Sequence, residues 1–233
     1  MSEAERGTKE LKRPYLGVRL GGSVLYGGSQ TLLKQRFLRL SGCGAVAGVE
    51  LLRYLLPEGE KAGPVSGAPE KGISADEWRP MLVRMAHRWF HVIPRVGMTG
   101  LALAVRLDLF FLLHRLPYRA RRCFSGKKLF SRMEEQLGRD VPVILTIGRN
   151  FPCFWKKERV PFYVKAADGS LLRVSGATGH FVTVTGMDER TLTISSWGKR
   201  FLVLRDDLTE YVRRHGTWLT TNMILVRKKG ERA

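Results

Sequence analysis

Apolar residues recur every three or four positions in the stretch that follows residues 41–44. They are Val46, Val49, Leu52 and Leu56. This spacing predicts an amphipathic helix, and Pro57 marks its latest possible end. Cys43 therefore lies at the start of the predicted helix.

The middle of the chain carries further helical patterns. Residues 57–73 are rich in Gly, Pro, Glu and Lys without an apolar period, which predicts an exposed connection. Ser74 and Glu77 have the spacing of a capping box, so we expect a helix there, kinked at Pro80. A second apolar helix is expected after Thr99, and a third from about 125 to 137.

From residue 141 the pattern changes to short β-branched runs. Segment 180–187 (HFVTVTGM) alternates, residues 188–190 are turn-like, and further extended runs follow at close spacing. The strands expected are 141–147, 180–187, 191–195, 201–204 and 223–226, with a short helix around 208–212. Helices first and an antiparallel meander last predict an α+β fold.

The same patterns suggest how the chain is organised. Residues 1–22 are polar and then Gly-rich, which predicts a flexible N-terminal segment. We expect one domain over 23–229 with a helical middle region at 74–138, and a short tail at 230–233. No internal repeat is found, and the 44% hydrophobic content is enough for a core in a chain of 233 residues.

The chain is strongly basic. It has 40 Lys plus Arg against 21 Asp plus Glu, a formal charge of +19 that is spread along its length. One local cluster consists of Arg115, Arg119, Arg121, Arg122, Lys127 and Lys128. Such a cluster is suited to an acidic protein, nucleic acid or anionic lipid, although a solvated basic face is the simpler interpretation.

Cysteine content and hydropathy bear on location. Three scattered cysteines do not form a disulfide framework, and the N-terminus has no apolar signal core. The most apolar stretch, 101–113, is interrupted by Arg106 and Asp108 and is shorter than the roughly 20 residues of a membrane span. We therefore expect a cytoplasmic protein with no transmembrane segment.

Cys43 is the first candidate for chemistry. A thiol at a helix N-terminus lies near unpaired backbone N–H groups and the positive end of the helix dipole, which favour the thiolate. Gly42 and Gly44 leave room for a substrate backbone beside the sulfur. The alternative is a buried structural cysteine.

The second candidate is a histidine on the predicted sheet. His180 opens a strand directly after Gly179, and the segment Ser195-Ser196-Trp197-Gly198 ends the next strand. Because adjacent strands lie about 4.8 Å apart, a hairpin brings this segment beside His180. Trp197 is expected as a lid over the imidazole or as a substrate-stacking residue.

Taken in order, the motifs 41–44, 179–186 and 195–198 resemble the papain-like cysteine peptidases, and especially their C39-like branch. The 137 positions from Cys43 to His180 fall within the papain-like window of about 130 to 150. The resemblance implies a papain-like fold, with the Cys-bearing helix packed on the antiparallel sheet. It also implies that Cys43 attacks a carbonyl, His180 transfers the proton and an upstream glutamine, Gln30 or Gln35, donates to the oxyanion.

The resemblance also implies substrate contacts and an orienting residue. Gly42, Gly44, Gly179 and Trp197 fall at substrate-binding positions, and no cofactor is implied. Ser195 stands where the family has Asn or Asp, and a hydroxyl supplies no negative charge to an imidazolium. Asp188 is a conceivable substitute, although a hairpin turn favours exposure.

Four functions are consistent with these residues. The first is a cysteine hydrolase that cleaves a peptide or amide bond. The others are a catalytically impaired binding module of the same fold, an acyltransferase using the same thioester, and a basic adaptor for nucleic acid or membranes.

Three further sequence features have no assigned role. His87 and His91 are one helical turn apart, but no third ligand accompanies them, so we expect no metal. Cys153 is interpreted as loop packing. Cys123, beside Arg121 and Arg122, has a reactive setting without an assigned function.

Overall fold

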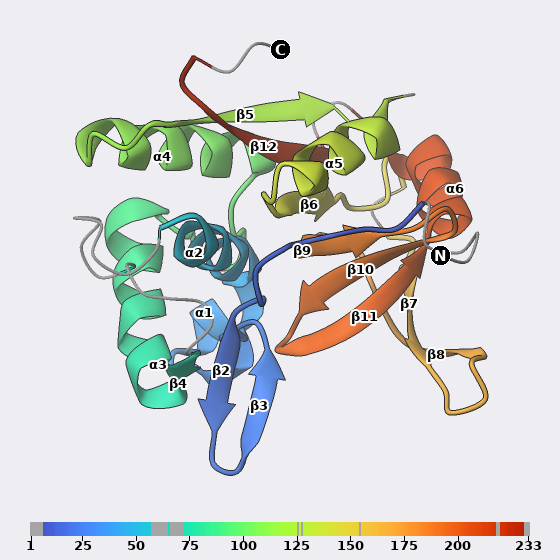
Figure 1. Cartoon of the computed structure of the whole chain (residues 1–233), viewed down its shortest axis with the longest axis horizontal. Helices are drawn as coiled ribbons and strands as arrows, with labels where there is room; N and C mark the ends of the chain where they lie inside the picture. The colour runs from blue at the N-terminus through green and yellow to red at the C-terminus, as the bar shows by residue number, and fades with distance from the viewer. Residues whose placement is uncertain are drawn as a thin grey trace.

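A large antiparallel sheet with helices on both faces forms the centre of the fold (Figure 1). The structure is a computed structural model that describes residues 7–56, 65, 72–124, 126, 128–153, 155–217 and 220–230. In this part of the chain the sheet has nine strands in the order β5-β12-β6-β9-β10-β11-β7-β8, and β1 pairs with β9. The α+β class with a large antiparallel sheet is confirmed.

The strands of this sheet come from distant parts of the sequence. They are β1 (Lys9–Glu10), β5 (Tyr118–Phe124), β6 (Val143–Ile147), β7 (Val160–Lys165), β8 (Leu171–Ala177), β9 (His180–Met187), β10 (Thr191–Ser196), β11 (Lys199–Leu204) and β12 (Asn222–Lys228). Only β9, β10 and β11 follow one another as a meander. The expected simple meander is therefore wrong, because β6 and β12 pair across long connections to the other side of β9.

Two of the long helices begin at a side-chain cap that the sequence supplies. The helices are α1 (Arg36–Ser41), α2 (Cys43–Leu55), α3 (Ala75–Arg84), α4 (Gly100–Leu113), α5 (Leu129–Gly138) and α6 (Arg205–His215), with the short 3-10 helix η2 (Gln30–Leu32). Ser74 and Glu77 form the expected capping box on α3, and Thr99 caps α4. The helices predicted after Cys43, Ser74 and Thr99 are confirmed.

Alternating side chains divide the core between the two faces of the sheet. Along β6, Ile144 packs with α2 and α4, whereas Val143 and Leu145 pack with α5 and α6. Every residue of β6 and β9 is buried, as expected for strands covered on both faces. This places β9, which begins with His180, directly against α2, which begins with Cys43.

The N-terminal segment differs from the prediction of a flexible chain. Within 7–22, β1 pairs with β9, and β2 (Gly17–Leu20) joins β3 (Ser23–Tyr26) and β4 (Ile73–Ser74) in a small second sheet. Leu16 and Val18 are fully buried. The sequence does not predict their burial, because the glycines and charged residues around them obscure any apolar pattern.

The helical middle region also contains an exception. Residues 118–124 (YRARRCF) form β5 and not part of a helix, since Tyr118 and Ala120 point into the core while Arg119 and Arg121 are exposed. Residues 1–6, 57–64, 66–71 and 231–233 lie outside the described residues, so most of the predicted connection and tail stay predictions. No helix among the described residues has the length and apolar character needed to cross a membrane.

Candidate functional site

Cys43 is the first residue of α2, as the sequence predicts. Gly42 forms the junction with α1, where a Cβ would lie 2.4 Å from the Leu38 carbonyl oxygen. Glycine thus allows α1 to stop and α2 to start without a gap. The first N–H groups of a helix have no intrahelical acceptor, so those beside the thiol can bind a negative oxygen.

His180 begins β9 on the neighbouring sheet. Gly179 precedes it with φ +60, a conformation that glycine adopts without strain. The imidazole stacks on Trp197 with ring centroids 4.5 Å apart and an interplanar angle of 23°. Its Nε2 lies 2.9 Å from the Ser196 hydroxyl oxygen. With Nε2 engaged, Nδ1 is the ring nitrogen left for proton transfer.

Cys43 and His180 line the same small cavity. Gln30, Phe181, Ser196 and Trp197 are also part of its wall. Its volume of about 10 Å³ matches a single water molecule. A peptide is too large for this cavity, and Cys43 itself is partly exposed.

The two glutamine candidates lie in different environments. Gln30 begins η2, is buried, and its Cβ approaches Gly42. Gln35 is exposed at the start of α1 and is not part of the cavity wall. Gln30 is thus the glutamine that accompanies Cys43.

Ser195 does not contact His180, contrary to its expected orienting position. Its hydroxyl faces away from the ring, 3.1 Å from the Tyr26 carbonyl oxygen and 3.0 Å from Glu50 Oε1. Successive side chains of a strand point to opposite faces, so the next residue, Ser196, reaches the imidazole instead.

Glu50 is the site residue that the sequence reasoning missed. This carboxylate on α2 is only 1% exposed and accepts hydrogen bonds from the Gly28 N–H at 2.8 Å and the Thr183 hydroxyl at 2.6 Å, besides Ser195. It joins α2 to β9, β10 and the loop that leads to Gln30. The sequence does contain a signal for it, because Glu50 is seven positions after Cys43 and therefore lies on the same face of the helix, two turns further on.

Burial controls the charge of the catalytic candidates. It raises the pKa of the Cys43 thiol, an effect only partly opposed by hydrogen bonds with the backbone of Phe181, Gly44 and Cys43. Burial also lowers the pKa of His180 to about 4. Near neutral pH the two groups are therefore a thiol and a neutral imidazole, and not the ion pair that a helix N-terminus alone would favour.

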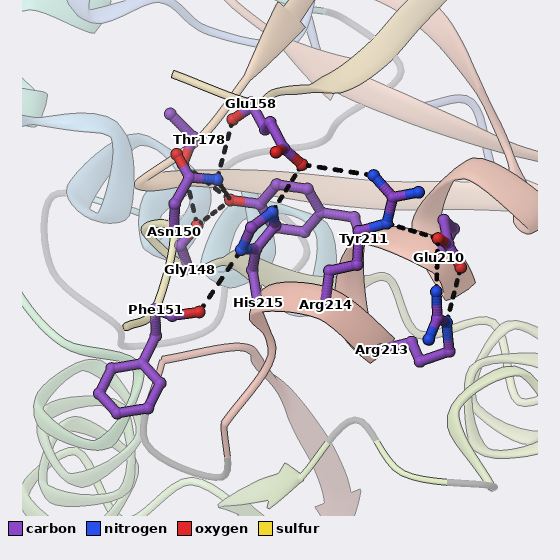
Figure 2. A network of polar contacts seen from close by, with 10 residues as sticks. All are labelled: Gly148, Asn150, Phe151, Glu158, Thr178, Glu210, Tyr211, Arg213, Arg214 and His215. Carbon is purple, nitrogen blue, oxygen red and sulfur yellow. Dashed lines mark hydrogen bonds and ion pairs between the residues drawn. The ribbon is translucent and has the colours of Figure 1, made fainter. Parts of the chain in front are cut away.

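A second polar network fixes the turn before His180 (Figure 2). The Gly148 carbonyl accepts hydrogen bonds from the Tyr211 hydroxyl at 2.6 Å, the Thr178 hydroxyl at 3.2 Å and the Gly179 N–H at 3.2 Å. Buried Asn150 extends it to Tyr211 and to the Glu158 carbonyl oxygen. The network ties α6 and the end of β6 to Thr178 and Gly179, the two residues before His180.

The segment 91–99 covers the start of α2. A Cβ on Gly44 would lie 2.7 Å from the Met98 sulfur, and one on Gly97 would lie 3.3 Å from the Ser41 carbonyl oxygen. Met98 thus occupies the space beside Gly44, which the sequence predicted to be open to a substrate. The space beside Gly42 is likewise occupied by the Leu38 carbonyl group, and the space beside Gly179 by the Arg149 side chain.

The remaining candidates lie apart from the cavity. Asp188 caps the β9–β10 turn by accepting from the backbone N–H groups of Arg190 and Thr191, at the far end of β9 from His180. A π-helix at Met85–Trp89 ends before His91, which has φ 49, so the helical spacing to His87 is lost. No cluster of three metal-ligating side chains occurs in the described ranges.

Comparison with known proteins gives a structural likeness but no match in sequence. No family model and no curated protein matches the chain. A matching solved structure is described as "an putative C39-like peptidase from Bacillus anthracis", with a TM-score of 0.45 and 12% identity. The match covers 81% of this chain and 90% of that one.

Proposed function

We propose that this chain is a cysteine hydrolase that cleaves a peptide or amide bond, with Cys43 as the nucleophile and His180 as the base. One observation carries the proposal. The thiol at the start of α2 and the imidazole at the start of β9 line one cavity together with Gln30. Nucleophile, base and oxyanion donor are the three parts that acyl transfer requires.

The chemistry follows from the neutral state of the pair. His180 Nδ1 takes the thiol proton while Cys43 Sγ attacks the carbonyl carbon, and the Cys43 N–H and the Gln30 amide hold the oxyanion. The C–N bond then breaks as His180 returns the proton to the leaving amine, which leaves a thioester on Cys43. Water, deprotonated by His180, releases the acid and restores the thiol.

Ser196 supplies the orienting contact in this scheme. A hydroxyl that accepts from Nε2–H holds the tautomer in which Nδ1 is free to act as a base. It adds no charge to stabilise the imidazolium, so we expect slower catalysis than a carboxylate partner would give.

A second function, a peptide-binding module without turnover, is favoured by the same electrostatics. The raised pKa of Cys43 and the lowered pKa of His180 both oppose formation of a thiolate–imidazolium pair. Such a module would retain peptide binding after Cys43 is removed.

The experiment is turnover of a panel of fluorogenic peptide amides by the wild-type chain and by C43A, with C123A and C153A as matched thiol controls. We expect turnover that C43A abolishes and that both controls retain. Binding of the same peptides to wild type and C43A, without release of product by either, would reject the hydrolase in favour of the binding module.

A further inference from the structure

A groove lined by cations lies at the β5 end of the large sheet, away from the cavity of Cys43. It is formed by β5, β12 and α5 and has a volume of about 380 Å³. Its cationic residues are Arg119, Arg121, Arg132, Arg227, Lys228 and Lys229. Two strands, β6 and β12, separate β5 from β9, so this is a second site on the molecule.

Strand register forces like charges together in the groove. Arg119 lies directly opposite Arg227, and Arg121 is two positions along β5 on the same face. Like charges that face each other across a strand pair are destabilising. Arg132 of α5 adds another guanidinium to this face.

Acidic residues compensate only part of this charge. Arg119 is paired with Asp108 at 2.8 Å, and Arg227 with Glu135 at 3.0 Å. The other four cations, Arg121, Arg132, Lys228 and Lys229, form no ion pair within the described part of the chain. An excess of about four positive charges therefore remains in one concave space.

We propose that this groove binds a ligand with a short run of linked phosphate groups. A triphosphate group carries about four negative charges near neutral pH, which complements the excess, and guanidinium groups pair with phosphate oxygens in a bidentate manner. The volume lies in the range of small-molecule sites, roughly 300 to 1,000 Å³. Cys123 and Leu225 provide an apolar part of the wall.

The observations favour a confined ligand over a nucleic-acid duplex. Duplex binding uses cations along an extended surface, and Arg115 and Arg122 of the predicted basic cluster do not line this groove. Lys128 is also outside it, and Lys127 lies outside the described residues.

The test is isothermal titration of the full chain with inorganic triphosphate and, separately, with ATP at 150 mM salt. We expect saturable one-to-one binding that R121A and R132A each weaken about tenfold, with unchanged binding by R190A, an exposed arginine on the β9–β10 turn. R121K should retain part of the affinity because it keeps the charge without the guanidinium fork. Equal binding of both ligands identifies the phosphate run as the recognised group, and tighter ATP binding shows that the apolar wall contributes.

Melting temperatures of the variants control for folding. Binding that R121A and R132A leave unchanged would overturn the proposal, as would failure to saturate. Displacement of triphosphate by duplex DNA at comparable phosphate concentration, with a steep salt dependence, would assign the groove to nucleic acid and reject the small ligand.

Discussion

The Ser195 hydroxyl lies 3.0 Å from Glu50 Oε1, and this contact gives two adjacent serines different surroundings. Ser195 belongs to the buried network around Glu50, whereas Ser196 contacts the His180 ring. The residue that orients the imidazole is thus one position further along β10 than the family pattern implies.

Replacement of each serine by alanine should separate these roles. We expect S196A to lower kcat/KM about tenfold, equal to about 1.4 kcal/mol, because the imidazole loses its orienting contact. S195A should leave kcat/KM near the wild-type value but lower the free energy of unfolding by about 1 kcal/mol. Turnover and urea unfolding of both variants measure the difference, and equal losses of kcat/KM would contradict it.

Glu50 should matter for stability more than its position in a helix suggests. E50A leaves the Gly28 N–H and the Thr183 hydroxyl without their acceptor, which we expect to cost at least about 2 kcal/mol of unfolding free energy. E50Q retains an acceptor oxygen and avoids the cost of a buried charge, the same burial that raises the pKa of Glu50. Its free energy of unfolding should therefore be close to that of the wild type. Urea unfolding at neutral pH measures both, and an unaffected E50A would refute the network.

His180 should make the stability depend on pH. Its pKa is lowered to about 4 in the folded chain, against about 6.5 when unfolded, so the unfolded state binds the proton first as the pH falls. The stability is fully present above about pH 6.5 and is lost progressively towards pH 4. Between pH 7 and 4.5 we expect wild type to lose about 2 kcal/mol more than H180Q, which does not titrate. Parallel losses in urea unfolding would show that the imidazole is not buried as described.

Removal of Met98 should open the approach to the thiol. Its sulfur lies against Gly44, so M98A should raise the rate at which iodoacetamide alkylates Cys43 several-fold while Cys123 serves as an internal reference. V96A, at an exposed position of the same segment, is the matched control. Mass spectrometry of the three cysteines measures the rates, and no acceleration in M98A would indicate that this segment does not limit access.

The sequence predicts the elements that bear the site more completely than the contacts between them. Apolar spacing and caps identify α2, α3 and α4, and alternation identifies β9 with its start at His180. The pairing of β6 and β12 across long connections has no local signal, and the strand β5 was hidden because arginines occupy its outward positions.

Within the site, Cys43, His180, Trp197 and Gln30 were predicted, and they line one cavity. Ser196 and not Ser195 contacts the imidazole because of the face of β10 that is turned toward the ring. The family pattern gives the order of residues but not the pairing of the strands, so it cannot predict which serine this is. The thiolate expected from the helix dipole is opposed by burial, which is a property of the packed structure and not of the motif.

The most direct test of the Cys43–His180 pair is the rate of acetylation of Cys43 by p-nitrophenyl acetate from pH 3.5 to 7, followed by intact mass and peptide mapping. The account predicts a rate that rises with a midpoint near the His180 pKa of about 4 and then levels off. In H180A the plateau should be absent and the rate should rise only with the thiolate fraction. The pair would be contradicted by the same pH profile in H180A, or by the absence both of an acetyl group on Cys43 and of p-nitrophenol release that C43A abolishes.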